Sequence, residues 1–455
     1  MKTASTLYSW LFSFIITSYI FFWSVELSNY NFRYNILILL VPIFFNFYKK
    51  IKNNNDKQYI YKIFSKNKNL IYFLFFIFAH LVIVSIFYDI PFRFYNLKSL
   101  IFFNLVAIIY VYYRKEIIVN LDKIISIFVY IFITTLAISF FIENNELIGF
   151  CTQKWVILLS NKYFNFYPIN NLLFQENSHI GMVLTGVLFY LLFLGINKFY
   201  YLLLFFATAF ASIFYFSTTY LAGLVFCGLS LSVYYFKKDL NYKKLISINV
   251  IIILIATSII FSDKNCSKKI LDIRIKDIYK KDFFSKENKY IFKNTTSAIY
   301  ERSIKSNINT FKNNILGWGF ANNDIATLAF VKNDSHLYFK ELHQSNAKAY
   351  IHKLGYFFDI NIPNFVDQMN LHDALGNLFK LFNEFGIFTI LIFYYFLIYL
   401  FREKKIEHYK IFFICIFLVQ LFRGAGYLNG GFCFVIVEIL LCQKLPKNYL
   451  SLRLK

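Results

Sequence analysis

Long apolar runs separated by short polar connections dominate the hydropathy pattern of the chain. A helix that spans a bilayer needs roughly 20 mostly apolar residues, and many runs approach this length. The pattern therefore predicts an all-α, polytopic membrane protein with about 12 transmembrane helices. The runs lie near 7–25, 35–48, 70–88, 99–113, 124–142, 178–196, 199–216, 219–236, 245–261, 385–401, 411–422 and 432–442.

Composition supports this class. Hydrophobic residues make up 58% of the chain, whereas soluble domains average roughly 45–50%. The first run, 7–25, is followed by ELSNYNFRYN, without a small-residue cleavage site. We therefore expect a retained first span rather than a cleaved signal peptide.

The formal net charge of +23 reflects topology rather than nucleic-acid binding. Lys and Arg concentrate in alternate connections, and such segments remain on the cytoplasmic side of a membrane. This bias predicts a membrane protein with both termini in the cytoplasm, and no basic groove indicates a nucleic-acid partner. The predicted inside connections are 49–69, 114–123, a short turn with Lys198, 237–244, 402–410 and the C-terminal tail.

One connection, 262–384, is much longer than the others and is predicted to lie outside. It divides the chain into an N-terminal transmembrane bundle (1–261), this outside loop and C-terminal transmembrane helices (385–455). Connections of this length are commonly functional. Apolar residues scattered through the loop indicate that it folds, and we expect it to contain amphipathic helices at the membrane face.

Within this loop, TTSAIYERSIKSNINTFKNNILGWGF (295–320) has the pattern of an amphipathic helix. Its first three residues are candidate N-caps, and Gly317 and Gly319 suit its C-terminal end because glycine tolerates left-handed backbone. One stripe is apolar, and Arg302, Ser306 and Asn309 lie on the other side. The apolar stripe consists of Ile304, Ile308, Phe311 and Ile315.

A second segment, NLHDALGNLFKLFNEFGIFTILIF (370–393), joins a polar head to an apolar tail that enters the membrane. On a helical wheel one face holds His372, Gly376, Phe379, Asn383 and Gly386. The two glycines allow close approach to the backbone by a ligand or by a neighbouring helix.

Polar residues at membrane depth are further functional candidates because ionisable groups are costly there. Glu176 lies at the outer mouth of the sixth span, while His80 and Glu438 lie inside apolar runs. Arg423 lies in RGAGYLNGG, whose glycines indicate irregular backbone lining a cavity.

Metal and cofactor chemistry has little support in the sequence. No CxxC, HExxH, Walker or GxSxG motif is present. His336, His343 and His352 are loosely spaced, so a metal site there is the weaker interpretation. Cysteines in apolar runs are expected to be small buried residues, namely Cys227, Cys415, Cys433 and Cys442.

The two loop segments, ERSIKSNINTFKNNILGWGF and HDALGNLFKLFNEFGIFTILIF, resemble motifs of the O-antigen polymerase and O-antigen ligase family of bacterial membrane glycosyltransferases. The resemblance implies a donor oligosaccharide carried on undecaprenyl pyrophosphate, and glycan transfer at the outer face of the inner membrane without metal or cofactor. It also implies membrane lipid and a chain-length regulator protein as partners. The absence of Arg from 143–177 favours polymerase over ligase.

The resemblance also assigns roles to residues. His372 is the expected catalytic base, since imidazole accepts a proton near neutral pH. Arg302 is expected to bind the pyrophosphate, because guanidinium forms bidentate contacts with phosphate. Residues expected to bind substrate are Arg423, Lys380, Glu176 and Asn383.

Two alternatives stay open at this stage. A ligase would move the glycan to lipid A-core instead of to another repeat unit. A flippase or transporter of lipid-linked glycan would instead show internal pseudo-symmetry and charged groups deep in its spans. The two halves of this chain are unlike each other.

Overall fold

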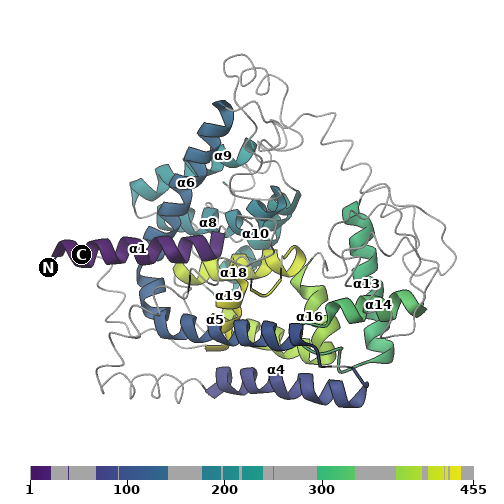
Figure 1. The fold of residues 1–455 in the computed structure, drawn as a ribbon. Helices are drawn as coiled ribbons and strands as arrows, with labels where there is room; N and C mark the ends of the chain where they lie inside the picture. The colour runs from purple at the N-terminus through teal and green to yellow at the C-terminus, as the bar shows by residue number, and fades with distance from the viewer. Residues whose placement is uncertain are drawn as a thin grey trace, which may run out of the picture. The chain divides into compact units, whose positions relative to one another are not determined.

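The residues that the computed structural model describes are mostly helical, joined by short turns (Figure 1). No strand occurs in these ranges, so the predicted all-α class is confirmed for them. The described residues are 2–21, 39, 68–90, 92–141, 177–195, 198–214, 218–238, 250, 295–333, 376–401, 408–424, 426–428 and 431–441.

The chain forms two compact units. The first unit consists of Met1–Tyr72, Phe102–Ser267 and Tyr395–Lys455. The second unit consists of Phe73–Ile101 and Lys268–Tyr394. Residues 73–101, which the sequence places in the N-terminal bundle, therefore cluster with the long loop, and so does the start of the C-terminal region.

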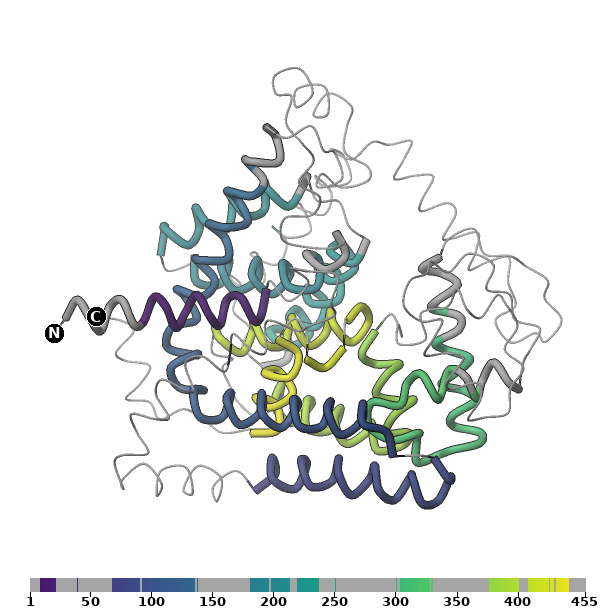
Figure 2. Tube along the Cα trace, viewed as in Figure 1, coloured from purple at the N-terminus to yellow at the C-terminus, as the bar shows by residue number. Residues whose placement is uncertain are grey.

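The helices of the first unit coincide with predicted apolar runs. Figure 2 shows the path of the chain coloured by residue number. Runs 35–48 and 245–261 lie almost wholly outside the described residues. The helices are α1 (Lys2–Phe21), most of α5 (Phe94–Val119), α6 (Leu121–Phe141), α8 (Asn177–Gly195), α9 (Phe199–Phe214), α10 (Thr218–Lys238), the end of α17 (Thr389–Phe401), α18 (His408–Phe422) and α19 (Phe432–Leu441).

Glycines let the helices of the first unit approach closely. A Cβ atom added at Gly181 of α8 would lie 2.8 Å from the backbone nitrogen of Tyr220 on α10. At Gly186, on the same helix, it would lie 2.9 Å from the side chain of Ile416 on α18. Small residues at helix contacts are typical of membrane bundles, where helices associate through close packing.

The second unit combines apolar and polar helices. Its elements are α4 (Lys68–Phe87), the first residues of α5, α13 (Thr295–Asn313), α14 (Asn323–Asn333), α16 (Asn377–Phe385), the short 3₁₀ helix η3 (Gly386–Phe388) and the start of α17. Helix α13 packs against both α14 and α16, which lie beside it in Figures 1 and 2. The predicted helix over 295–320 is thereby confirmed as far as Asn313.

Among the described residues, four helical segments are long and apolar enough to cross a membrane: Lys68–Phe87, Phe94–Val119, Thr219–Phe236 and Asn377–Leu400. Several shorter apolar helices accompany them, among them α18 and α19. Large apolar side chains such as Phe75 and Ile86 of α4 face outward, as lipid-facing residues do. These features are those of a helical membrane protein, while the count of 12 spans remains a prediction.

Candidate functional site

The candidate site lies where the two resemblance-bearing segments meet in the second unit. The aromatic rings of Tyr300 on α13 and Phe379 on α16 lie 5.9 Å apart between centroids. Further along α13, the Asn307 side chain donates to the Phe379 carbonyl (2.9 Å), and Thr310 donates to the Asn383 side chain (3.1 Å). Later residues of α13 thus meet later residues of α16, so the two helices run in the same direction.

Asn383 joins three helices through its side-chain amide. Its oxygen accepts hydrogen bonds from Ser306 (3.3 Å), Asn307 (2.6 Å) and Thr310 (3.1 Å) of α13. Its NH₂ group donates to Asn323 at the start of α14 (2.9 Å). Buried amides need such partners because an unpaired polar group is costly away from water. Both ends of this predicted substrate-binding amide are therefore engaged by the protein itself.

Helix α13 turns its polar stripe toward the protein. The buried positions recur with the helical period and consist of Ser303, Ser306, Asn307, Thr310 and Asn314. By contrast, Phe311 and Ile315 of the predicted apolar stripe are exposed. The amphipathic pattern therefore exists as predicted, but its inward face is the polar one.

The loop after α13 pairs with the end of α16 through backbone hydrogen bonds. The Trp318 and Gly319 amides donate to the carbonyls of Asn383 and Glu384, both at 2.8 Å, and the Ile387 amide donates to the Ile315 carbonyl (3.0 Å). Gly317 and Gly319 have φ of 83° and 88°, which confirms the left-handed backbone expected of them.

The two glycines that flank α16 do not have the helical backbone that was predicted for them. Gly376 is extended (φ −139°, ψ 150°) and the helix begins at Asn377, so a continuous helix through Gly376 is wrong. Gly386 has φ of 53°, and a Cβ atom there would lie 2.1 Å from the Ile315 carbonyl oxygen. Protein backbone, rather than a ligand, therefore occupies the space beside Gly386.

His80, singled out as ionisable inside an apolar run, contacts this loop. One ring nitrogen lies 2.7 Å from the Leu316 carbonyl oxygen. The imidazole also packs among the rings of Phe76, Phe385 and Phe388. These contacts join α4 to the segment between α13 and α14, which is a structural role for this histidine.

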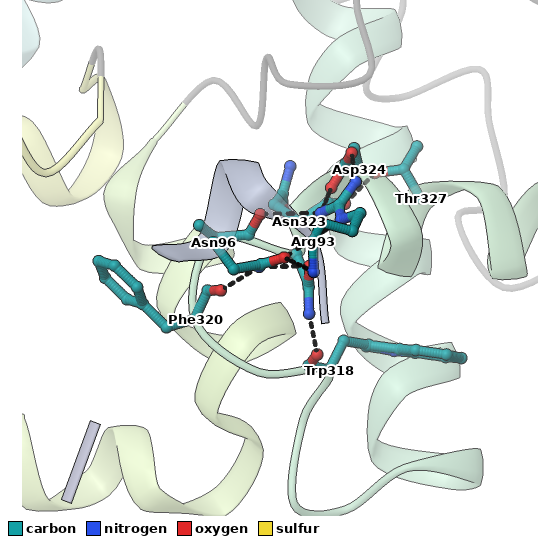
Figure 3. Close-up of polar contacts among 9 residues, drawn as sticks. Arg93, Asn96, Trp318, Phe320, Asn323, Asp324 and Thr327 are labelled. Atoms are coloured by element: carbon teal, nitrogen blue, oxygen red, sulfur yellow. Dashed lines mark hydrogen bonds and ion pairs between the residues drawn. The ribbon is translucent and has the colours of Figure 1, made fainter. Parts of the chain in front are cut away.

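Arg93 forms a second polar cluster at the turn between α4 and α5 (Figure 3). Its guanidinium donates to both carboxylate oxygens of Asp324, at 2.6 and 3.0 Å. It also donates to the Asn322 side chain and to the Ala321 carbonyl. Asn96 extends the cluster by donating to the Phe320 carbonyl at 2.7 Å. The cluster fixes the start of α14 to the α4–α5 turn.

This cluster was not predicted from the sequence. Arg93 and Asp324 are 231 positions apart, and no local spacing links them. The Asn322-Asn323-Asp324 run after the glycines was the available signal, since short polar residues favour helix N-termini.

The structure describes only some of the predicted site residues. His372 and Glu176 lie outside the described residues, and for Arg302 only its place in α13 is described. Lys380 is half-buried on α16. Arg423, also half-buried, lies in a bend after α18 in the first unit, where Gly426 has φ of 103°. Irregular backbone beside Arg423 was expected.

In sequence, His372 precedes Gly376 by four positions. Arg302 lies two positions beyond Tyr300, which touches α16 near its start.

Glu438, another ionisable candidate, is buried in the first unit and paired. Its carboxylate accepts two hydrogen bonds from Arg114 of α5, at 2.6 and 2.8 Å. It also accepts one from the Tyr110 hydroxyl at 2.9 Å. Three polar groups thereby satisfy one another between apolar helices, as ionisable groups at membrane depth commonly do.

Cysteines and metal ligands add no further site among the described residues. Cys227, Cys415 and Cys433 are buried free thiols, as predicted. Cys442 and the histidines at 336, 343 and 352 lie outside the described ranges. Within those ranges, no group of three His, Cys, Asp or Glu side chains is placed to hold a metal ion.

Comparison of the chain with family models, with curated proteins and with solved structures finds no match.

Proposed function

We propose that the protein is a glycosyltransferase that polymerises undecaprenyl-pyrophosphate-linked oligosaccharide repeat units at the periplasmic face of the bacterial inner membrane. Both termini would lie in the cytoplasm, consistent with the distribution of Lys and Arg. The product would be a polysaccharide of the O-antigen or capsule type. The proposal needs neither a metal ion nor a nucleotide sugar.

The observation that supports it best is the common direction of α13 and α16. These helices belong to segments far apart in sequence. One helix contains a residue that the proposed reaction needs, and the other helix comes shortly after a second such residue in the sequence. Arg302 lies in the first half of α13, and His372 lies just before α16. Because the Tyr300–Phe379 contact joins these ends, a substrate placed there could meet both residues.

In the proposed reaction, an acceptor hydroxyl attacks the anomeric carbon of the donor glycan. His372 accepts the hydroxyl proton while the new glycosidic bond forms. The bond between the anomeric carbon and the pyrophosphate oxygen breaks, and lipid pyrophosphate leaves with the bonding electrons. Arg302 offsets the developing negative charge.

Other residues would assist binding. Lys380, one helical turn after Gly376, and Arg423 would add positive charge for the pyrophosphate. Glu176 would accept hydrogen bonds from sugar hydroxyls. Asn383 would position the helices of the site rather than bind substrate, because its amide holds α13 and α14 against α16.

The direct test uses the full chain, purified and reconstituted in liposomes with undecaprenyl-pyrophosphate-linked repeat units. We expect a ladder of elongated glycans from the unchanged protein, also in the presence of a chelator. His372→Ala should reduce elongation by about 10²–10⁴-fold. Arg302→Ala should reduce it strongly, and Lys312→Ala, on an exposed position of the same helix, should leave it unchanged.

If the His372→Ala variant elongated glycans at the unchanged rate, His372 would not be the catalytic base. A cellular experiment separates the alternatives. Loss of the gene should leave single repeats on lipid A-core if the protein is a polymerase, and bare core if it is a ligase. Accumulation of donor on the cytoplasmic side would instead identify a flippase.

A further inference from the structure

Helix α13 presents apolar side chains outward although its other face is packed. The α13 stripe comprises Ile304, Ile308 and Phe311 of the helix and Ile315, two positions beyond its end. Ile315 is 52% exposed and Phe311 is 40% exposed, while Ile304 and Ile308 are half-buried. Polar side chains occupy the inward face of α13, so burial against this unit does not explain the stripe. Rows of exposed apolar residues commonly mark a contact surface.

The α13 stripe continues into the outer surface of a candidate membrane span. Its last residue, Ile315, accepts a backbone hydrogen bond from Ile387 (3.0 Å), which belongs to the segment Asn377–Leu400. The exposed apolar residues of that segment include Ile387, Ile390, Leu391 and Tyr394. The surface therefore passes from α13 to α17 across a hydrogen-bonded backbone.

Aromatic rings make the same connection a second time. The ring of Phe311 lies 5.4 Å from that of Phe382 on α16, between centroids. Phe382 in turn stacks on Phe393 of α17 at 6.4 Å. A row of three rings thus joins the α13 stripe to the apolar part of the span.

We propose that the α13 stripe contacts the acyl chains of the bilayer, so that α13 lies along the membrane surface as an interfacial helix. A bilayer that covers the outer face of α17 meets the adjoining stripe on the same surface. Exposed Lys312 and Asn313 follow Phe311, and a Lys side chain near the interface can extend its ammonium group to lipid headgroups. This proposal is independent of the reaction proposed above.

Lipid with photoactivatable acyl chains tests the unchanged protein in liposomes. After illumination, mass spectrometry locates the peptides that carry lipid. We expect adducts on the peptide containing Phe311 and Ile315, as well as on the outer residues of α17. Adducts on α17 with none on 304–315 would overturn the proposal.

Site-specific probes give a second, independent test. An environment-sensitive fluorophore is attached to Phe311→Cys or Ile315→Cys in liposomes, with Lys312→Cys and Asn313→Cys as neighbouring controls and the labelled parent chain as background. We expect nitroxide-labelled lipid to quench the stripe probes several-fold more than aqueous iodide, and the control probes to show the reverse preference. Equal quenching by iodide at all four positions would contradict the proposal, and so would stripe probes that neither agent reaches, because protein would then cover the stripe.

Discussion

The apolar core around α8 and the polar core around α13 pack by different means. In the first unit, the described side chains of α8 are buried, Leu188 and Phe189 among them, and glycines of α8 set how closely α10 and α18 approach. In the second unit, α13 meets α14 and α16 through amides and hydroxyls that converge on Asn383. The first core depends on shape, and the second depends on matched donors and acceptors.

This difference shows where the geometry of the chain is most tightly specified. Apolar side chains can repack with modest cost when volume is kept, whereas a buried hydrogen-bond network tolerates few alternative arrangements. The register between α13 and α16 is fixed by such a network. Because these helices bear or adjoin the proposed catalytic residues, the polar core is where precise placement matters most for function.

Among the described residues, each unit also shows one arginine–carboxylate pair, and the first prediction concerns the pair between apolar helices. Glu438→Ala should lower the free energy of unfolding by about 3–5 kcal/mol, because the Arg114 guanidinium is left without its buried partner. Unfolding of the purified protein in detergent measures this. The double variant Arg114→Met/Glu438→Leu should recover most of the loss, and a double variant less stable than the single one would argue against this reading.

The second prediction tests the backbone approach in the polar core. Gly386→Ala should cost about 2–4 kcal/mol, because the added methyl group meets the Ile315 carbonyl and φ is positive. Gly319→Ala is the matched control, since its φ is also positive but its nearest contact is the Leu81 side chain at 3.0 Å. It should cost about 1–2 kcal/mol. Equal losses would show that backbone proximity is unimportant.

The third prediction tests the amide junction itself. Asn383→Leu should cost about 2–3 kcal/mol, because Asn307 and Asn323 lose their buried partner. Thr208→Val in the first unit is the control, since the Thr208 hydroxyl bonds only to Leu204 of its own helix among the described contacts. That change should cost less than about 1 kcal/mol. A reversed order of the two losses, in the same unfolding experiment, would remove the contrast between the cores.

The smallest expected effect concerns the Arg93 cluster. Arg93→Lys keeps the charge but loses the two-pronged contact with Asp324, so a loss of about 1–2 kcal/mol is expected. Protease cleavage near the α4–α5 turn and α14 should become faster. Unchanged stability and cleavage would mean that charge alone, without fork geometry, holds this turn.

Sequence patterns predicted the apolar helices well, because the hydropathy of one segment determines whether it can be buried in lipid or in an apolar core. The C-terminal end of α13 could also be predicted from the sequence, because Gly317 and Gly319 indicate left-handed backbone just after it. Burial of the cysteines in α10, α18 and α19 followed from the same local reasoning.

The polar core could not be predicted, because its partners are distant in sequence. The contacts between Asn307 or Thr310 and Asn383 join residues more than seventy positions apart. Periodicity indicates that α13 has two faces, but which face packs inward depends on the chemistry of α14 and α16. The break at Gly376 was missed for a related reason: its extended backbone reflects the path of the chain into α16.

The most direct test of the central claim measures whether positions 302 and 372 lie at the same end of the α13–α16 pair. Spin labels are placed at 372 and either 302 or 313 in the reconstituted full chain, and pulsed EPR gives both distances. Positions 302 and 313 are separated by about 16 Å along the helix. We predict the shorter distance for the 302–372 pair. A shorter distance between 313 and 372 would contradict the proposed site.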